Sequence, residues 1–310
     1  MLSLAGNCYT KPKMISPDQV VEMLKPTTTP GPIPTVVPTP PHYQEASAAG
    51  HRTLWVVFAL MVLSSGFFTL LSWNVPTSKR LFHVITTLIT IIASLSYFAM
   101  ASGQASSFVC SAAKDHHKHV PDIPYTECRQ IYWARYVDWA LTTPLLILDL
   151  CFLAGVDGAH TLMAVIADVI MVLSGLFAAY GDNKTAQHWG WYAIGCISYI
   201  FVIWHVAVHG SKMVRAKGVK VTRLFGSLAL FTLALWTAYP VVWGIADGAH
   251  KMSVDTEVVA YAVLDLLAKP VFGTWLLISH RALAETNVDL GGWWSQGFGS
   301  EGRIRIGDEN

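Results

Sequence analysis

Charge is what this 310-residue sequence lacks most. Only 13% of its residues are Asp, Glu, Lys or Arg, whereas soluble proteins average about 25%. This shortage excludes an ordinary soluble domain. An excess of either sign is also missing, because 21 basic residues stand against 20 acidic ones, so nothing points to a nucleic-acid or strongly acidic partner. Hydrophobic residues make up 53% of the chain and come in long blocks, which indicates a membrane protein.

The first 50 residues lack such blocks. The stretch Pro26–Pro41 has no charged residue and is rich in Pro and Thr, a composition that builds neither a core nor a regular helix. We therefore expect residues 1–50 to form a disordered tail. A cleavable signal peptide is not expected, because no basic segment followed by a long apolar stretch opens the sequence. Membrane targeting then falls to the first spanning segment.

Seven apolar segments are long enough to cross a bilayer, whose hydrocarbon core of roughly 30 Å needs about 20 helical residues. They are Thr53–Trp73, Leu81–Ser102, Ile131–Ala154, Ala159–Tyr180, Trp189–His209, Leu224–Ala246 and Val258–His280. The sequence therefore predicts an all-α fold, a bundle of seven transmembrane helices over residues 51–285. Residues 286–310 are left as a C-terminal tail.

Basic residues in short loops set the orientation, because cytoplasmic loops carry an excess of Lys and Arg. The segment 210–223 has five basic residues and no acidic one, and Lys79 and Arg80 fall on the same side of a seven-span bundle. We therefore expect the C-terminus in the cytoplasm and the N-terminus outside. The expected location is an integral position in the plasma membrane.

One lysine stands within the last apolar segment. A bare ammonium at bilayer depth costs at least about 2.5–3.5 kcal/mol, so Lys269 needs a partner or a chemical use. Asp265 precedes it by four residues, which places both on one helix face. Lysine is also the residue that condenses with aldehydes to form Schiff bases.

The third segment holds more buried charge. Asp149 follows Asp138 by 11 residues, which is about three helical turns and a rise of about 16 Å on nearly one face. One carboxylate on each side of an apolar stretch is the layout of a proton path. An ion pair of Arg135 with Asp138, together with an Asp149 solvated near the interface, fits this segment alone equally well. Asp168 is explained at least as well by a protonated acid hydrogen-bonded between helices.

Aromatic residues give a second indication. Ordinary packing or an interfacial belt explains any one of Trp139, Trp236, Tyr239 and Trp243 taken singly. Trp139 and Trp236, however, fall at mid-depth and not at the interface. A slot between aromatic planes suits a flat, conjugated ligand. Pro144 and Pro240 interrupt backbone hydrogen bonds within spans, which is tolerated where neighbouring groups satisfy them.

Three stretches together resemble the microbial (type I) rhodopsins, and among them most closely the fungal opsins. They are RYVDWALTTPLLILDL at 135–150, WTAYPVVW at 236–243 and LDLLAK at 264–269. The resemblance covers about residues 52–285. It implies a light-driven ion transporter, not an enzyme, whose helices enclose a retinal chromophore.

The resemblance also implies roles for single residues. Lys269 would hold all-trans retinal covalently as a protonated Schiff base, with Asp138 and Asp265 as counterions. Asp138 would be the proton acceptor and Asp149 the proton donor. The other implied proton-transfer residues are Arg135, which would move between the counterions and the exit, and the release acids Asp247 and Glu257. The implied retinal-binding residues besides Lys269 are Tyr97, Trp139, Thr142, Met171, Trp236, Tyr239 and Trp243.

Several local features stay open. Pro270 follows the lysine and lacks an N–H for the Leu266 carbonyl, which predicts an irregular helix there. Trp191 and Tyr192 compete for one position on the pocket wall. Cys110 and Cys128 flank an outer loop where oxidising conditions permit a disulfide, although spacing alone cannot establish one. The histidine run 116–119 in that loop suits either a metal or plain solvation.

The favoured function is an outward light-driven proton pump. The alternative is a photosensory rhodopsin that signals through a partner with little or slow pumping. Carboxylates at both Asp138 and Asp149 favour pumping, because a sensor needs no cytoplasmic donor. An anion pump would want a neutral residue in place of Asp138. The expected partners are the lipid bilayer and protons; the sequence identifies no signalling partner and leaves assembly into a homo-oligomer open.

Overall fold

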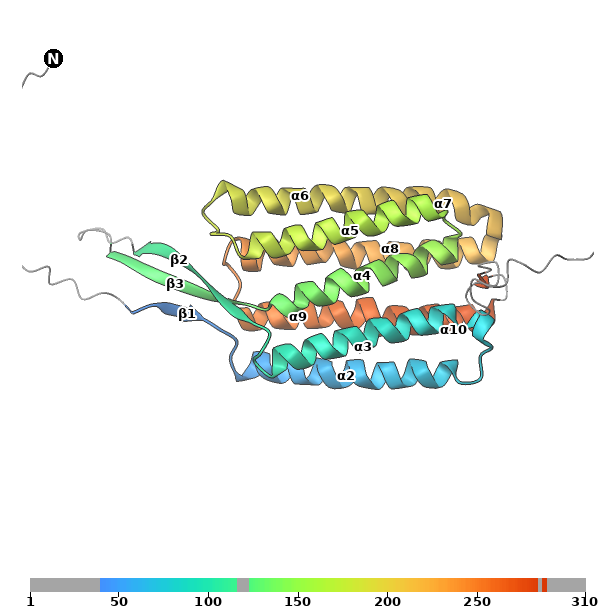
Figure 1. The fold of residues 1–310 in the computed structure, drawn as a ribbon, viewed down its shortest axis with the longest axis horizontal. Coiled ribbons are helices and arrows are strands. Elements are labelled where there is room, and N and C mark those ends of the chain that lie inside the picture. Colours follow the sequence, from blue (N-terminus) through green and yellow to red (C-terminus); the bar gives the residue numbers. More distant parts are fainter. Residues whose placement is uncertain (1–39, 116–122, 284–285, 289–310) are drawn as a thin grey trace, which may run out of the picture. The chain divides into compact units, whose positions relative to one another are not determined.

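The structure is a computed structural model that describes residues 40–115, 123–283 and 286–288. The chain divides into two units, 1–39 and 40–310, and every described residue belongs to the second. Among the described residues, seven helices are long and apolar enough to cross a membrane, which confirms the predicted seven-helix fold (Figure 1). Most of both expected tails and the histidine run 116–119 lie outside the described residues.

Four of the spans are single helices and three are compound. The single ones are α2 (Ala48–Ser72), α3 (Leu81–Ala101), α4 (Trp133–Ala154) and α5 (Gly158–Ala179). The fifth span joins α6 (Ala186–Ile203), a π-helical turn (Trp204–His209), α7 (Gly210–Met213) and a 3-10 turn (Val214–Lys217). The sixth joins α8 (Val219–Trp243) to a π-helical turn (Gly244–Gly248). The seventh joins α9 (Val254–Leu266), a π-helical turn (Leu267–Val271) and α10 (Phe272–Ala282).

Serine side chains cap the N-termini of two of the apolar helices. Ser47 accepts a hydrogen bond from the backbone of Ala49 at the start of α2, and Ser253 accepts one from Thr256 at the start of α9. Such caps satisfy N–H groups that have no partner within the helix. Gly155 ends α4 in a left-handed conformation, with φ of 74°, which a residue without a side chain adopts most readily.

The sequence did not predict a small sheet. Strands β2 (Ser107–Asp115) and β3 (Ile123–Ile131) form an antiparallel hairpin, and β1 (His42–Gln44) pairs with β3 in parallel. Residues 42–50, placed in the tail from sequence, instead form β1 and the start of α2. A disulfide joins Cys110 and Cys128 across the hairpin, at directly paired positions. We call the end of the bundle that carries this sheet the sheet end (Figure 1).

The opposite end carries the basic segment 210–223, and we call it the basic end. Sequence composition suggested a loop there, but the segment is helical on both sides of Gly218. Gly218 has φ of 93° and ψ of 166°, a conformation that is essentially restricted to glycine. The fifth and sixth spans therefore meet at a sharp corner.

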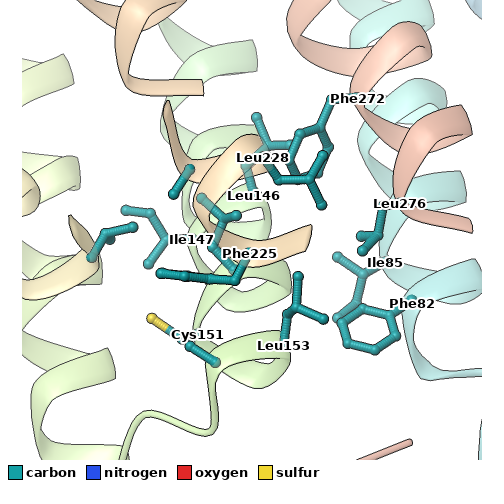
Figure 2. Close-up of a cluster of buried hydrophobic side chains, with 14 of the residues drawn as sticks. Phe82, Ile85, Leu146, Ile147, Cys151, Leu153, Phe225, Leu228, Phe272 and Leu276 are labelled. Carbon is teal, nitrogen blue, oxygen red and sulfur yellow. The ribbon is translucent and has the colours of Figure 1, made fainter. Parts of the chain in front are cut away.

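Apolar packing fills the half of the bundle nearer the basic end. Figure 2 shows side chains from α3, α4, α8 and α10 that meet in one cluster. Its labelled members are Phe82, Ile85, Leu146, Ile147, Cys151, Leu153, Phe225, Leu228, Phe272 and Leu276. We call this group the apolar cluster, and it surrounds the second half of α4.

Candidate functional site

The functional site centres on Lys269, which lies in the π-helical turn between α9 and α10. Its Nζ is 2.5 Å from Asp138 Oδ2 on α4 and 3.2 Å from Asp265 Oδ1 on α9. All three side chains are at most 2% exposed. An isolated ammonium at this depth would be costly, and two carboxylates in contact with it offset that cost.

The two carboxylates have different surroundings. Asp265 accepts hydrogen bonds from Tyr97 Oη at 2.6 Å, Tyr239 Oη at 2.7 Å and Trp139 Nε1 at 3.3 Å. Among the described residues, Asp138 Oδ1 has no hydrogen-bond partner. Hydrogen bonds to a carboxylate favour its ionised form. Asp265 is therefore held as an anion, whereas Asp138 keeps an oxygen free to take a proton.

The helix around Lys269 is irregular, as the sequence predicted. Pro270 cannot donate a backbone hydrogen bond, and the chain forms a π-helical turn over Leu267–Val271 at this point. Such one-turn π segments often occur at functional sites. Here the turn carries the lysine itself.

A cavity begins at Lys269 and runs between α4, α5, α6 and α8. Of the residues implied by the resemblance, Trp139, Met171, Trp236, Tyr239 and Trp243 line it. Its remaining lining is also mostly aromatic or aliphatic. A predominantly apolar wall with a single reactive polar group at one end fits a conjugated aldehyde such as retinal.

Two expected pocket residues have other contacts. Thr142 donates its hydroxyl to the backbone oxygen of Asp138, and Tyr97 belongs to the Asp265 network. Neither is among the residues that line the cavity. Of the two candidates on the fifth span, Tyr192 lines the cavity and stacks on Trp243.

Asp149 lies in the apolar half of the bundle. Its side chain is fully buried, and neither carboxyl oxygen has a hydrogen-bond partner among the described residues. Neighbouring positions on α4, such as Leu146 and Leu153, belong to the apolar cluster. The interfacial, solvated Asp149 considered from sequence is therefore not what the structure shows. An unpaired buried carboxyl carries a large cost as an anion, so the group keeps its proton.

Asp168 is a further buried acid within the bundle. Its Oδ2 accepts a hydrogen bond of 2.6 Å from Thr143 Oγ1, which links α5 to α4. This is the interhelical hydrogen bond that the sequence suggested for Asp168. Thr143 also lines the cavity, so this link braces the cavity wall.

At the sheet end, two arginines and two carboxylates form a buried cluster. Arg135 contacts Glu257 at 2.5 Å and makes no ion pair with Asp138. Arg129 contacts Glu257 at 2.6 Å and Asp247 at 3.3 Å. We call these four residues the exit cluster. They bring together the implied release acids with a second arginine that sequence reasoning did not single out.

Arg129 also ties the cluster to the N-terminal segment. Its Nη1 donates to Gln44 Oε1 on β1 and to the backbone oxygen of Met252, both at 2.9 Å. The side chain is 0% exposed although it lies on β3, in what the sequence presents as a polar loop. Its position four residues before Trp133, the first residue of α4, is the one sequence feature that hinted at burial.

A hydrogen-bonded chain connects the cavity to the exit cluster. Trp243 Nε1 donates to Tyr136 Oη at 2.8 Å, and Tyr136 Oη donates to Asp247 Oδ2 at 3.1 Å. Both aromatic residues line the cavity. A change in the cavity wall can therefore reach Asp247 through two contacts.

Two titratable groups near the exit cluster lie outside the spans. Burial raises the pKa of Tyr132 to about 12. Burial also lowers the pKa of His250, and the positive charge of Arg129 adds to this effect. Both groups are therefore neutral at pH 7. The charge of the exit cluster is then set by its own two arginines and two carboxylates.

Comparisons with known proteins agree with this geometry. A family described as bacteriorhodopsin-like protein matches residues 49–283. Opsin-1 of Neurospora crassa is 70% identical over 304 residues, which is 96% of this chain and 100% of Opsin-1. Among solved structures, the light-driven proton pump LR (Mac) from Leptosphaeria maculans is 55% identical with a TM-score of 0.77, over 79% of this chain and 100% of that one. The light-driven proton pump CsR from Coccomyxa subellipsoidea is 36% identical with a TM-score of 0.69, over 76% and 99% of the two chains.

The fold and the buried lysine define a seven-helix integral membrane protein with an internal ligand site. The chain belongs to the bacteriorhodopsin-like family, the microbial rhodopsins. It is thus a member of a family of retinal-binding ion transporters and not an enzyme.

Proposed function

We propose that this protein is an outward light-driven proton pump. The proposal rests on two acids of α4: Asp138, which contacts Lys269, and Asp149, which is buried and has no hydrogen-bond partner among the described residues. One acid is placed to receive a proton and the other to supply one. Lys269 would hold all-trans retinal as a protonated Schiff base, and the bound chromophore would supply the absorption of light.

Asp138 acts as the proton acceptor. Its Oδ2 lies 2.5 Å from the Lys269 nitrogen, within the reach required for direct proton transfer. Asp265 is the poorer acceptor, because three donors already hold its oxygens. Asp265 remains charged and balances the nitrogen while Asp138 is neutral.

The exit cluster releases a proton to the sheet end. Once Asp138 is neutral, its attraction for the Arg135 guanidinium falls, so the positive charge of Arg135, which already contacts Glu257, acts more fully on the exit cluster. Two arginines near Asp247 and Glu257 then favour the fully ionised form of both acids. The proton that the two acids had shared leaves on that side.

Asp149 returns a proton to the Lys269 nitrogen. The apolar cluster keeps water from Asp149 in the resting protein, so the group stays protonated until the interior rearranges. A protonated acid on one side and an ionised acid on the other make the transfer one-directional. The route runs from the basic end to the sheet end.

The proposed orientation places the basic end in the cytoplasm. The segment 210–223 carries its five basic residues there, as expected for a cytoplasmic connection. The disulfide of the sheet end then faces the oxidising exterior. We place the protein in the plasma membrane, with the N-terminus outside.

Illumination of cells or sealed vesicles tests the function. We expect the external medium to acidify in light, a protonophore to abolish the signal, and D138N to abolish it as well. D182N, which changes an aspartate in the turn before α6, is the matched control and should pump normally. An intact visible band without any pH change would instead identify a photosensor, and alkalinisation would contradict the proposed direction.

Reconstitution with retinal tests the linkage separately. The wild-type protein should develop a visible absorption band that survives denaturation in acid, because the ligand is covalently bound. K269A should bind no retinal that survives this treatment. A covalent adduct in K269A would place the attachment at another residue.

A further inference from the structure

A second cluster of polar side chains lies at the basic end, away from the retinal site. It joins Asp157 and His160, at the start of α5, to His205 and His209 in the π-helical turn that follows α6. Nothing in the proposed proton route uses these four residues. Their side chains are exposed or half-buried, so ions from solution can reach them.

The cluster is tightly arranged. Asp157 Oδ2 lies 3.2 Å from His209 Nε2, and the rings of His160 and His209 are stacked with centroids 3.6 Å apart. One ligand atom each from Asp157, His160 and His209 can be chosen so that all three lie within 4.8 Å of one another. Imidazole nitrogens and a carboxylate oxygen around one point are the donors that zinc prefers.

Each donor is also held in place. Asp157 uses Oδ1 to cap α5, accepting from the backbone N–H groups of Ala159 and His160. Its Oδ2 faces His209 Nε2, so a metal ion can take the place of the proton between these two atoms. His160 Nδ1 lies 2.9 Å from His205 Nδ1, so one hydrogen is shared between these atoms. Metal-binding histidines commonly use their second nitrogen in such a bond, which fixes the ring.

We propose that Asp157, His160 and His209 form a binding site for a divalent transition-metal ion of the Zn²⁺ class, with His205 as a positioning residue. Three protein ligands leave room for water in the fourth position. A bound ion would clamp the start of α5 to the continuation of α6. The proposal concerns these surface residues only and does not depend on the pumping activity.

Direct titration with Zn²⁺ tests the site. The full chain, purified without a histidine tag, should carry glutamine at 116, 117 and 119 so that the histidine run there does not compete. Calorimetry should then give one Zn²⁺ per chain, and Zn²⁺ should raise the temperature at which the protein unfolds. No saturable binding in this background would overturn the proposal.

Two ligand variants make the test specific. D157N keeps the helix cap, because Asn caps as well as Asp, but removes the carboxylate. H209Q removes an imidazole. We expect each to abolish the calorimetric signal, and H205Q to weaken binding by about 10–100-fold. The control H42Q changes an exposed histidine on β1 and should bind like the background chain; unchanged affinity in both D157N and H209Q would place the ion elsewhere.

Discussion

Asp138 and Asp265 contact the same lysine, yet their neighbours give them different chemistry. Three donors contact Asp265, whereas one oxygen of Asp138 has no hydrogen-bond partner among the described residues. The difference depends on side chains from α3, α4 and α8 and not on the carboxylates themselves. For this reason the sequence can indicate both acids, but the difference in their hydrogen bonding appears only in the structure.

Asp149 gives a prediction at the scale of one residue. In D149N no internal donor remains, so the Lys269 nitrogen must recover its proton from bulk solution. We expect this step to slow by about 10²–10⁴-fold, the usual contribution of a positioned acid. Flash spectroscopy of the photocycle measures it.

The pH dependence of that step separates the donor role from a structural one. In D149N the slow phase should become about tenfold slower per unit rise in pH, because free protons are now the reactant. The control D168N removes a buried carboxyl that Thr143 holds between helices, and its decay should stay independent of pH. A pH-independent decay in D149N would contradict the proposed donor.

Arg129 gives a second prediction. Among the described residues, R129Q leaves Glu257 with Arg135 as its one remaining ion-pair partner and leaves the buried Asp247 with none. Removing one partner from a buried ionic network costs about 3–5 kcal/mol. We expect a clearly lower temperature for thermal loss of the visible band and an altered time of proton release.

R52Q is the comparison for that variant. Arg52 is exposed on α2 and donates to a backbone oxygen within its own helix. Exposed substitutions of this kind usually stay within about 0.5 kcal/mol. If R129Q and R52Q lost the visible band at the same temperature, the contacts of Arg129 in the exit cluster would contribute nothing to stability.

At the scale of elements, the sequence predicts what depends on local pattern. Apolar runs of about 20 residues specify the helices, and the structure has all seven. Strand β1 was missed because His42–Gln44 has no alternating pattern and gains its conformation only by pairing with β3. The segment 210–223 was predicted to be a loop because its basic residues interrupt the apolar pattern. In the structure it is helical up to Gly218 and again after it.

Gly218 gives a prediction for the corner between α7 and α8. An added Cβ meets no atom within 4 Å there, so G218A changes only the backbone preference. A non-glycine residue in this conformation costs about 1–3 kcal/mol. We expect a lower melting temperature for G218A.

Gly226 provides the matched substitution. It lies within α8, and an added Cβ there also meets no atom within 4 Å. G226A should stabilise the protein by about 0.5–1 kcal/mol, because alanine favours helix. Replacing glycine by alanine should therefore lower stability at Gly218 and raise it at Gly226, although neither site is crowded. Equal changes in stability would refute the explanation from backbone conformation.

At the scale of the whole bundle, the two halves differ in kind. The half near the sheet end contains the ion pairs of Lys269 and, separately, the exit cluster. The half near the basic end contains the apolar cluster and Asp149, whose carboxyl oxygens have no hydrogen-bond partner among the described residues. The proposed direction of transport follows from this difference.

The sequence predicted the charged residues inside the bundle, but it did not predict that Arg129 belongs to the exit cluster. Lys269, Asp138 and Asp149 are detectable because charge within an apolar segment is costly and therefore conspicuous. Arg129 is not, because charge in a polar loop is ordinary until the fold buries it. Tyr192 and Trp191 are adjacent in the sequence, and the rotation of α6 about its axis decides which of them faces the cavity. That rotation depends on packing against neighbouring helices.

The apolar cluster in Figure 2 also has an electrical consequence. A layer that excludes water and ions sustains most of the membrane potential, and each elementary charge crossing 100 mV exchanges about 2.3 kcal/mol with it. In the proposed mechanism, a proton that enters from the basic end must cross this layer to reach Asp149. As an outward pump makes the cell interior more negative, refilling of Asp149 becomes slower. The same packing that stores the proton therefore lets the membrane voltage limit the turnover of the pump.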